Sequence, residues 1–293
     1  MNTYADWLRG HGEPVYRAAG IEWRLYHSAL VPVNDVPVPV SADRDELRRL
    51  LRDSGAWLAR YPGPATDRPD PDWYYVVCDE AAPVERLAKK TRYELRLGQK
   101  SCSVRRVTAE WLAGHGYDCY RAAHERYRNL RPSPEAVFVR EIRQRAEGPF
   151  EIWGAFVGPE LAAYSTCITT GQWVLHSTAK YHPGFLHART AYALVRALVE
   201  EYVGARGLAL VNGTRSVAHD TNYNHLLEKL GFVRHGYELD IVYRPILETL
   251  VNIAWPLRRA FSWLPDVGPA HGARVGLMLE SLRRTTALAG ARA

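Results

Sequence analysis

A predicted strand at residues 172–181 (QWVLHSTAKY) carries a histidine and a lysine whose side chains can do chemistry. Alternation along the strand places His176 and Thr178 on one face. His176 can relay a proton, because imidazole titrates near neutral pH, or it can be a hydrogen-bonded structural residue. Lys180, near the end of the strand, can hold a phosphate or a carboxylate, or it can lie exposed. We therefore expect His176 to be catalytic and Thr178 and Lys180 to bind substrate.

A second set of polar side chains follows a predicted buried strand at 208–214 (LALVNGT) and opens a predicted helix at 221–232 (TNYNHLLEKLGF). Such side chains can hydrogen-bond a substrate, or they can cap the turn that follows the strand. The tyrosine can donate a proton or can simply pack, since seventeen tyrosines occur in the chain. We expect catalytic roles for Asn212 and Tyr223, and substrate-binding roles for Thr214 and Asn224.

Metal-based and triad chemistry find no support in the sequence. The four cysteines form no CxxC pair, so a zinc site is not expected, and they fit reduced thiols in a cytoplasmic protein. His219 and Asp220 are neighbours in sequence, and neighbouring side chains rarely face each other, so we do not interpret them as a dyad. We expect no metal, and a protein that acts mainly by positioning its reactants.

A strongly basic segment occupies residues 84–100 (VERLAKKTRYELRLGQK). Six of its side chains are basic and two are acidic, within a chain of formal net charge +6 and pI about 9.1. Val84, Leu87 and Leu97 recur at a spacing that predicts a helix, uninterrupted until Gly98. Such a helix is often only a solvated face, but Lys and Arg gathered on one element also suit a polyanionic partner.

The order of predicted elements indicates an α/β fold with a mixed sheet. In the first half we expect a strand at 21–33, a helix at 41–61, a loop at 62–72 and a strand at 73–78. In the second half we expect a strand at 102–108, helices at 109–130 and 133–148, antiparallel strands at 150–158, 160–171 and 172–181, a long helix at 187–207, and a last strand at 233–245.

The C-terminal segment 246–264 predicts a basic amphipathic helix that either packs on its own domain or lies on a membrane surface. We favour packing, because Pro256 shortens the helix. No segment approaches the roughly twenty apolar residues of a membrane span, and we expect a cytoplasmic protein.

The segment HLLEKLGF (225–232), together with this element order, resembles the GNAT fold of N-acyltransferases. Residues 72–107, an aromatic strand followed by a K-K-x-R-x-x-[IL]-R helix, resemble the FemXAB family more narrowly. FemXAB proteins have two GNAT-like halves. The resemblance therefore implies a truncated first half at 1–100 that includes the basic helix, a GNAT-like acyltransferase core at 101–245, and a helical tail at 246–293.

Two positions depart from acetyl-CoA-dependent GNATs. Their pyrophosphate loop, R/Q-x-x-G-x-G/A, corresponds here to YHPGFL (181–186), in which only Gly184 fits and Pro183 removes an N–H donor. The tyrosine that often acts as general acid corresponds to Leu227. Both departures fit an acyl donor that is presented on RNA.

Family members transfer an amino acid from aminoacyl-tRNA to an amine of a peptidoglycan precursor, and some relatives act on peptide antibiotics. The resemblance thus implies no cofactor, aminoacyl-tRNA as co-substrate, and a peptide acceptor that can be linked to a lipid or carrier. It implies tRNA binding by Lys89, Lys90, Arg92, Arg96 and Lys100. The alternatives are an acyl-CoA-dependent N-acetyltransferase and a non-catalytic GNAT-like scaffold that binds RNA or an anionic membrane.

Overall fold

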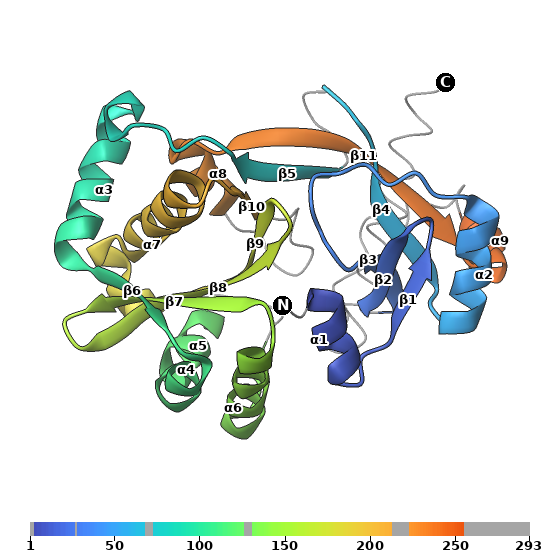
Figure 1. Ribbon diagram of the computed structural model, residues 1–293, viewed down its shortest axis with the longest axis horizontal. Coiled ribbons are helices and arrows are strands. Elements are labelled where there is room, and N and C mark those ends of the chain that lie inside the picture. The colour runs from blue at the N-terminus through green and yellow to red at the C-terminus, as the bar shows by residue number, and fades with distance from the viewer. Residues whose placement is uncertain (1–2, 27, 68–72, 126–130, 213–222, 255–293) are drawn as a thin grey trace. The chain divides into compact units, whose positions relative to one another are not determined.

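The computed structural model describes residues 3–26, 28–67, 73–125, 131–212 and 223–254. These residues form two compact units that alternate along the chain (Figure 1). Within the described residues, unit 1 combines 3–7, 75–212 and 223–234, and unit 2 combines 8–67, 73–74 and 235–254. The division at residues 100 and 245 expected from the sequence stays a prediction about the two family-like halves.

Unit 1 is built on a mixed sheet. Its strands run in the order β5 (Trp73–Cys78), β10 (Ala209–Asn212), β9 (Trp173–Tyr181), β8 (Glu160–Thr170), β7 (Phe150–Val157) and β6 (Ser103–Val107). β10 and β9 are parallel, whereas the other neighbours are antiparallel. Gly158 and Gly171 turn the two hairpins at φ 58° and 57°, a conformation that favours glycine, so the predicted meander is confirmed.

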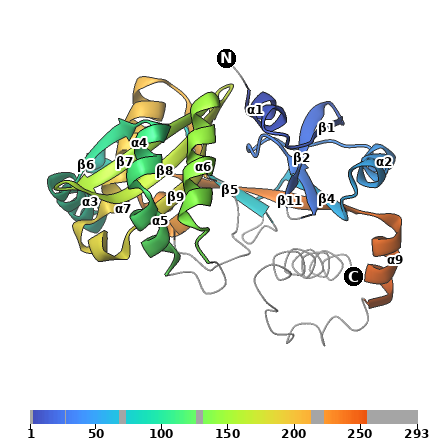
Figure 2. The ribbon, with the colours of Figure 1, turned by 90° about the horizontal axis from the view of Figure 1, so that it is seen from below.

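Helices cover both faces of the β6–β9 sheet (Figures 1 and 2). α3 (Lys89–Ser101) and α7 (Thr190–Leu198) lie on one face, and α4 (Ala109–His115), α5 (Tyr117–His124) and α6 (Glu135–Gln144) lie on the other. The single helix expected at 109–130 is wrong. The chain bends at Gly116, where an added Cβ would lie 2.6 Å from the Leu112 carbonyl oxygen.

The long helix expected at 187–207 is also more complex than predicted. It begins with a 3₁₀ turn, η3 (Pro183–Ala188), continues as α7, and ends as a π-helical segment, η4 (Val199–Ala205). The remaining short elements of unit 1 are η1 (Val84–Arg86), η2 (Arg145–Glu147) and α8 (Tyr223–Lys229).

The basic helix α3 packs against α7 through a narrow buried stripe of Thr91, Leu95 and Gly98. An alanine Cβ at Gly98 would lie 2.8 Å from the Arg189 carbonyl oxygen and 3.2 Å from the Ala193 nitrogen. Gly98 therefore does not end the helix. It allows the two helix backbones to approach closely, and α3 continues beyond it to Ser101.

We expect Gly98→Ala to lower the free energy of unfolding by about 1–3 kcal/mol, because the methyl group would meet backbone atoms that cannot move aside. Gly114→Ala is the matched control, since that glycine lies on helix α4 with open space at the Cβ position. The control should be neutral or stabilising by roughly 0.5–1 kcal/mol. Urea unfolding of the two variants checks the difference, and equal stabilities would contradict the close packing of α3.

Unit 2 holds β1 (Val15–Ala18), β2 (Ile21–Tyr26), β3 (Ala29–Pro32), β4 (Leu58–Ala65) and most of β11 (Val233–Tyr243), with α2 (Arg44–Ser54) and part of α1 (Tyr4–Gly10). Its core gathers Trp23, Leu30, Leu47, Leu51 and Tyr61. The single strand expected at 21–33 is a hairpin, because Ser28 takes a left-handed conformation at φ 67°.

The expected helix at 41–61 ends early. Asp43 caps its start, and Gly55, at φ 72°, ends it after Ser54. Leu58, near the end of the segment that was expected to be helical, belongs to β4. The first part of the expected loop at 62–72 is also part of this strand.

α9 (Pro245–Ala254) is the described part of the predicted C-terminal helix. Its Glu248 forms an ion pair with Arg48 of α2 at 3.0 Å, within unit 2. This contact fits packing on its own domain, while residues 255–264 lie outside the described part of the chain. No helix among the described residues is both long and apolar enough to cross a bilayer.

Candidate functional site

Three side chains from two elements meet at the end of β9. Tyr223, the first residue of α8, has its hydroxyl oxygen 3.3 Å from His176 Nδ1. The Tyr181 hydroxyl donates to the Tyr223 hydroxyl at 3.1 Å. The fold thus brings together the predicted His176 and Tyr223 and adds Tyr181, which the sequence indicated only as a departure from the CoA loop pattern.

His176 is held in an apolar interior. Its side chain is 7% exposed, and its Nε2 atom is buried with no hydrogen-bond partner among the described residues. Burial lowers the pKa of His176 to about 4, because the charged imidazolium is disfavoured away from water. The imidazole is therefore neutral at pH 7 and is a weak base there.

This burial predicts an acid-sensitive fold. The pKa of His176 is about 4 in the folded state and about 6.5 when the chain is unfolded, so the unfolded state binds the proton first. The contribution of neutral His176 to the free energy of unfolding is therefore fully present above pH 6.5, and it is lost as the pH falls towards 4. We expect wild type to lose about 2 kcal/mol relative to His176→Gln between pH 7.5 and pH 5. Urea unfolding at both pH values measures this, and parallel losses would refute it.

Asn212 and Asn224 also meet. The Asn212 Nδ2 group donates to the Asn224 Oδ1 atom at 2.7 Å, which links the end of β10 to the first turn of α8. Val211 pairs with Leu175 across the parallel strands, so Asn212 and His176 follow at the same level of the sheet. Thr214, the other polar residue predicted here, lies outside the described residues.

The prediction that Thr178 shares a face with His176 is wrong, and Lys180 also lies on the other face. Cys167 pairs with His176 and Thr166 with Thr178, with a register shift between the two pairs. Neighbouring residues of β8 point to opposite faces, so this bulge puts His176 and Thr178 on opposite sides of the sheet. The strand alternation predicted at 172–181 is therefore wrong at Ser177, the extra residue.

Lys180 lies on the face covered by α4, α5 and α6. Its Nζ atom is 5.8 Å from the centre of the Tyr120 ring of α5. Burial, with a smaller contribution from the nearby guanidinium of Arg145, lowers the pKa of Lys180 to about 8. Part of the Lys180 population is thus an uncharged amine near neutral pH.

The basic side chains of α3 divide into two kinds. Lys89, Lys90, Arg96 and Lys100 are exposed, whereas the Arg92 Nη1 group donates to the Glu85 carbonyl oxygen at 2.7 Å. Tyr93 is 58% exposed and lies on the same outer side as Lys89, Arg96 and Lys100. Each of these four residues is three or four positions from the next, and residues at that spacing lie on one side of a helix. The acid of this helix, Glu94, forms an ion pair with Arg189 of unit 1. The outward side of α3 is therefore cationic, with one aromatic ring.

The segment that corresponds to a CoA pyrophosphate loop has its amide donors engaged within the chain. The Gly184 N–H donates to His182 Nδ1 at 3.1 Å, and the Phe185 N–H donates to the His182 carbonyl oxygen at 3.1 Å. Pro183 has no N–H. The equivalent of the GNAT acid, Leu227, is a fully buried apolar residue.

No family model matches the sequence, and no curated protein matches it. Solved structures match the fold. FemX aligns with a TM-score of 0.56 at 10% identity, over 84% of this chain and 92% of its own. The C-terminal DUF2156 domain of a putative lysylphosphatidylglycerol synthetase from Agrobacterium fabrum aligns with a TM-score of 0.54 at 8% identity. The alignment covers 86% of this chain and 91% of that domain. L-PGS from Bacillus licheniformis aligns with a TM-score of 0.50 at 12% identity, over 85% of this chain and 90% of its own.

The chain has a GNAT-type fold. The resemblance to FemXAB proteins is confirmed in the arrangement of helices and strands, at sequence identities at which a likeness establishes the fold alone.

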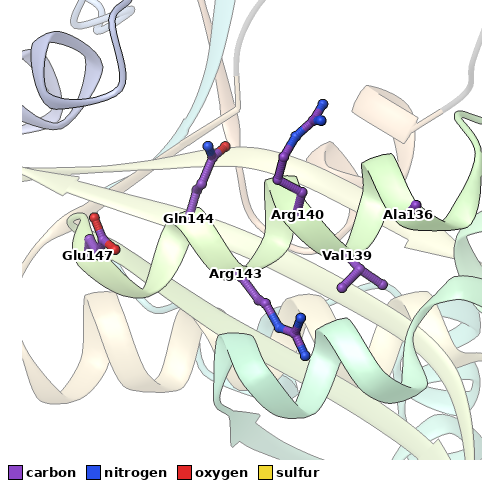
Figure 3. A pocket seen from close by; sticks show the side chains of 6 residues that line it. All are labelled: Ala136, Val139, Arg140, Arg143, Gln144 and Glu147. Carbon is purple, nitrogen blue, oxygen red and sulfur yellow. The ribbon is translucent and has the colours of Figure 1, made fainter.

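A hollow of about 480 Å³ lies against α6 (Figure 3). Its six lining residues all belong to α6 and η2, and one of them, Arg143, forms a bidentate ion pair with Glu110. Because the lining comes from one continuous stretch of chain, and the Arg143 guanidinium is already paired, we do not treat this hollow as a candidate site.

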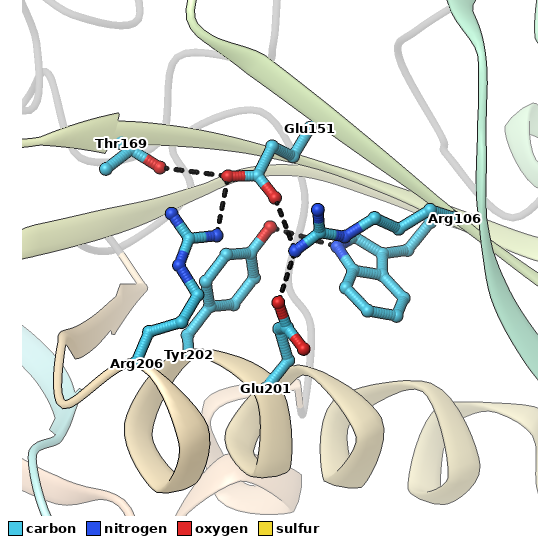
Figure 4. A network of polar contacts seen from close by, with 7 residues as sticks. Arg106, Glu151, Thr169, Glu201, Tyr202 and Arg206 are labelled. Carbon is cyan, nitrogen blue, oxygen red and sulfur yellow. Dashed lines mark hydrogen bonds and ion pairs between the residues drawn. The ribbon is translucent and has the colours of Figure 1, made fainter.

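A polar network centred on the half-buried Glu151 braces the face of the sheet that α7 and η4 cover (Figure 4). Glu151 of β7 accepts from Arg206 at 2.7 Å and forms an ion pair with Arg106 at 2.9 Å. Arg106 also pairs with Glu201 of η4, and the Trp153 Nε1 group donates to the Tyr202 hydroxyl at 2.9 Å. These contacts tie η4 to β6 and β7, and we interpret the network as structural.

Proposed function

We propose that the chain is an N-acyltransferase that moves an aminoacyl group from aminoacyl-tRNA to an amine of a peptide acceptor. The observation that carries the proposal is the segment before α7, where Pro183 and the hydrogen bonds around His182 leave few amide donors for a CoA pyrophosphate. A GNAT-type fold that does not offer that anion site needs its acyl group from another carrier.

The outward side of α3 supports RNA as that carrier. Lys89, Lys90, Arg96 and Lys100 can replace the counterions of a polyphosphate backbone. Tyr93 lies among them, and an exposed aromatic ring within a basic surface can stack on an unpaired base. Arg92 contributes less, because part of its guanidinium is engaged by Glu85.

The chemistry of this proposal asks little of the protein. The acceptor nitrogen attacks the ester carbonyl carbon, the C–N bond forms, the C–O bond to the ribose breaks, and the amine proton ends on the ribose oxygen. With its low pKa, His176 is a poor general base at pH 7, so the reactants exchange this proton largely between themselves. Tyr181, Tyr223 and the Asn212–Asn224 pair then position the reacting groups.

Donor binding tests the proposal directly. We expect aminoacyl-tRNA to raise the melting temperature in a concentration-dependent way, as mass action requires of a ligand of the native state. Acetyl-CoA at up to about a hundred micromolar should leave the melting temperature unchanged, because the loop offers no free set of amide donors. A saturable shift with acetyl-CoA and none with tRNA would replace the proposal with the acyl-CoA alternative.

A further inference from the structure

Arg145 is a half-buried cation at the C-terminal end of α6, and the described residues supply it with no ion pair. Its Nη1 group donates to the Thr166 hydroxyl oxygen of β8 at 2.8 Å, and its guanidinium lies 5.7 Å from the centre of the Phe150 ring. Glu141 attracts it from a longer distance than an ion pair. Burial lowers the pKa of Arg145, which shows that its charge is poorly solvated.

Two other half-buried arginines among the described residues have carboxylate partners. Arg206 pairs with Glu151 at 2.7 Å, and Arg48 pairs with Glu248 at 3.0 Å. A partly desolvated charge normally finds such a partner, because desolvation costs several kcal/mol that an ion pair offsets. Arg145 has no such partner among the described residues, which leaves a place for an anionic ligand.

A second cation lies beside it. Thr166, the hydrogen-bond partner of Arg145, pairs with Thr178 on β9, and Tyr164 pairs with Lys180. Thr166 and Lys180 are therefore diagonal neighbours on one face of the sheet, within reach of long side chains. Burial is the main cause of the lowered pKa of Lys180, and the charge of Arg145 also lowers it.

The open edge of Arg145 has the geometry that recognises an oxyanion. Its Nη1 group faces Thr166, whereas Nε and Nη2, the two nitrogens that together bind two oxygens, carry no hydrogen bond within the described residues. Neither atom is among the fully buried polar atoms without a partner, so both can be reached from solvent. Burial raises the pKa of the Cys119 thiol, which lies near Lys180, to about 12, so this thiol carries no charge at pH 7.

We propose that Arg145 and Lys180 form a binding site for an oxyanion, a carboxylate or a phosphate, carried by the acceptor substrate. The assignment of this anion to the acceptor rests on the proposed function, whereas the site itself does not. Arg145 supplies the bidentate edge, Lys180 supplies a second charge, and the Tyr120 ring lines the site beneath Lys180. Sequence reasoning found Lys180 but missed Arg145, because nothing in its local pattern separates it from its exposed neighbours.

The binding test follows the ammonium of Lys180, one of five lysines, by NMR while inorganic phosphate or N-acetylglycine is added at constant ionic strength. We expect one or both anions to raise the Lys180 pKa saturably, since a bound anion favours the charged amine. The two probes distinguish a phosphate from a peptide carboxylate as the natural group. Arg145→Gln should weaken binding about tenfold or more, and Arg145→Lys, which keeps the charge and loses the fork, should fall between.

Arg143→Gln is the matched control, because Arg143 lies two residues away on α6 and is already paired with Glu110. Each variant is compared at equal folded fraction. If neither anion moves the Lys180 pKa beyond the effect of chloride, or if Arg145→Gln binds as tightly as Arg143→Gln, the site is refuted.

A transfer assay separates this site from the proposed function. With charged tRNA, Arg145→Gln should raise KM for an acidic acceptor about tenfold and leave KM for the amidated acceptor unchanged. If both anions bind through Arg145 and Lys180 but no transfer occurs from charged tRNA, the site stands and the proposed function falls. If transfer occurs with equal KM for both acceptors in both proteins, the function stands and the role of the site in acceptor binding falls.

Discussion

Replacing Lys89, Lys90, Arg96 and Lys100 together with alanine is expected to weaken aminoacyl-tRNA binding by about two orders of magnitude at 0.15 M salt. The four side chains are exposed on the outward side of α3, away from the stripe that packs on α7. Each lost phosphate contact removes one released counterion, so the slope of log K against log salt should fall by about three in total. Filter binding of charged tRNA from 50 to 300 mM salt measures both quantities.

The matched control removes the same number of charges elsewhere. Arg17, Arg49, Arg52 and Lys229 are exposed and lie off α3, so their joint replacement lowers the net charge equally. If RNA binding needs the α3 surface, the control keeps most of its affinity. Equal losses in the two quadruple variants would mean that net charge alone drives binding, and undiminished affinity in the α3 variant would remove this surface from the proposal.

Glu151→Gln is expected to destabilise unit 1 by about 2–3 kcal/mol. The substitution keeps the shape of the side chain but leaves Arg106 and Arg206 without the carboxylate that lies between them (Figure 4). The new amide group would also place a donor against a guanidinium, which has no acceptor. Because Glu151 is only 22% exposed in its side chain, solvent can replace little of the lost interaction. Urea unfolding measures the change.

Glu110→Gln serves as the control for this prediction. Glu110 also binds an arginine in a bidentate pair, with Arg143, but both side chains are exposed. Exposed ion pairs contribute little to stability, so the control should unfold close to wild type. A Glu151→Gln variant as stable as Glu110→Gln would show that the network does not brace η4 against the sheet.

Hydrophobic periodicity predicted the architecture of unit 1 well. The three-stranded meander at 150–181 was readable because each turn carries a glycine that must adopt a positive φ. The errors fall where tertiary contacts override local pattern. The chain bends at Gly116, where Leu112 leaves no room for a Cβ, and Gly98 lies inside a helix, where it allows the backbones of α3 and α7 to approach closely. In unit 2 the hairpin at 21–32 was missed because Ser28, not glycine, takes the left-handed conformation.

The candidate site was less predictable, because it depends on register. Nothing in the segment HSTAK signals the extra residue Ser177, yet this bulge decides that His176 and Lys180 serve opposite faces of the sheet. His176 meets Tyr223, and Asn212 meets Asn224, because β10 lies parallel to β9. The order of the elements in the sequence suggests that these strands are neighbours, but it does not fix their register. Arg145 had no local signal, since its isolation from carboxylates is a property of three-dimensional packing.

The claim at the centre of this account is that the acyl donor is carried on RNA. A single-turnover assay tests it most directly, with tRNA charged with radiolabelled amino acids, a peptide amine as acceptor, and acetyl-CoA in a parallel reaction. We expect the label to move into an acceptor product that is stable to mild base, as an amide is and an aminoacyl ester is not. Digestion of the tRNA with ribonuclease before the enzyme is added should abolish transfer. Acetylated acceptor from acetyl-CoA, with no label transferred from any charged tRNA, would contradict the account.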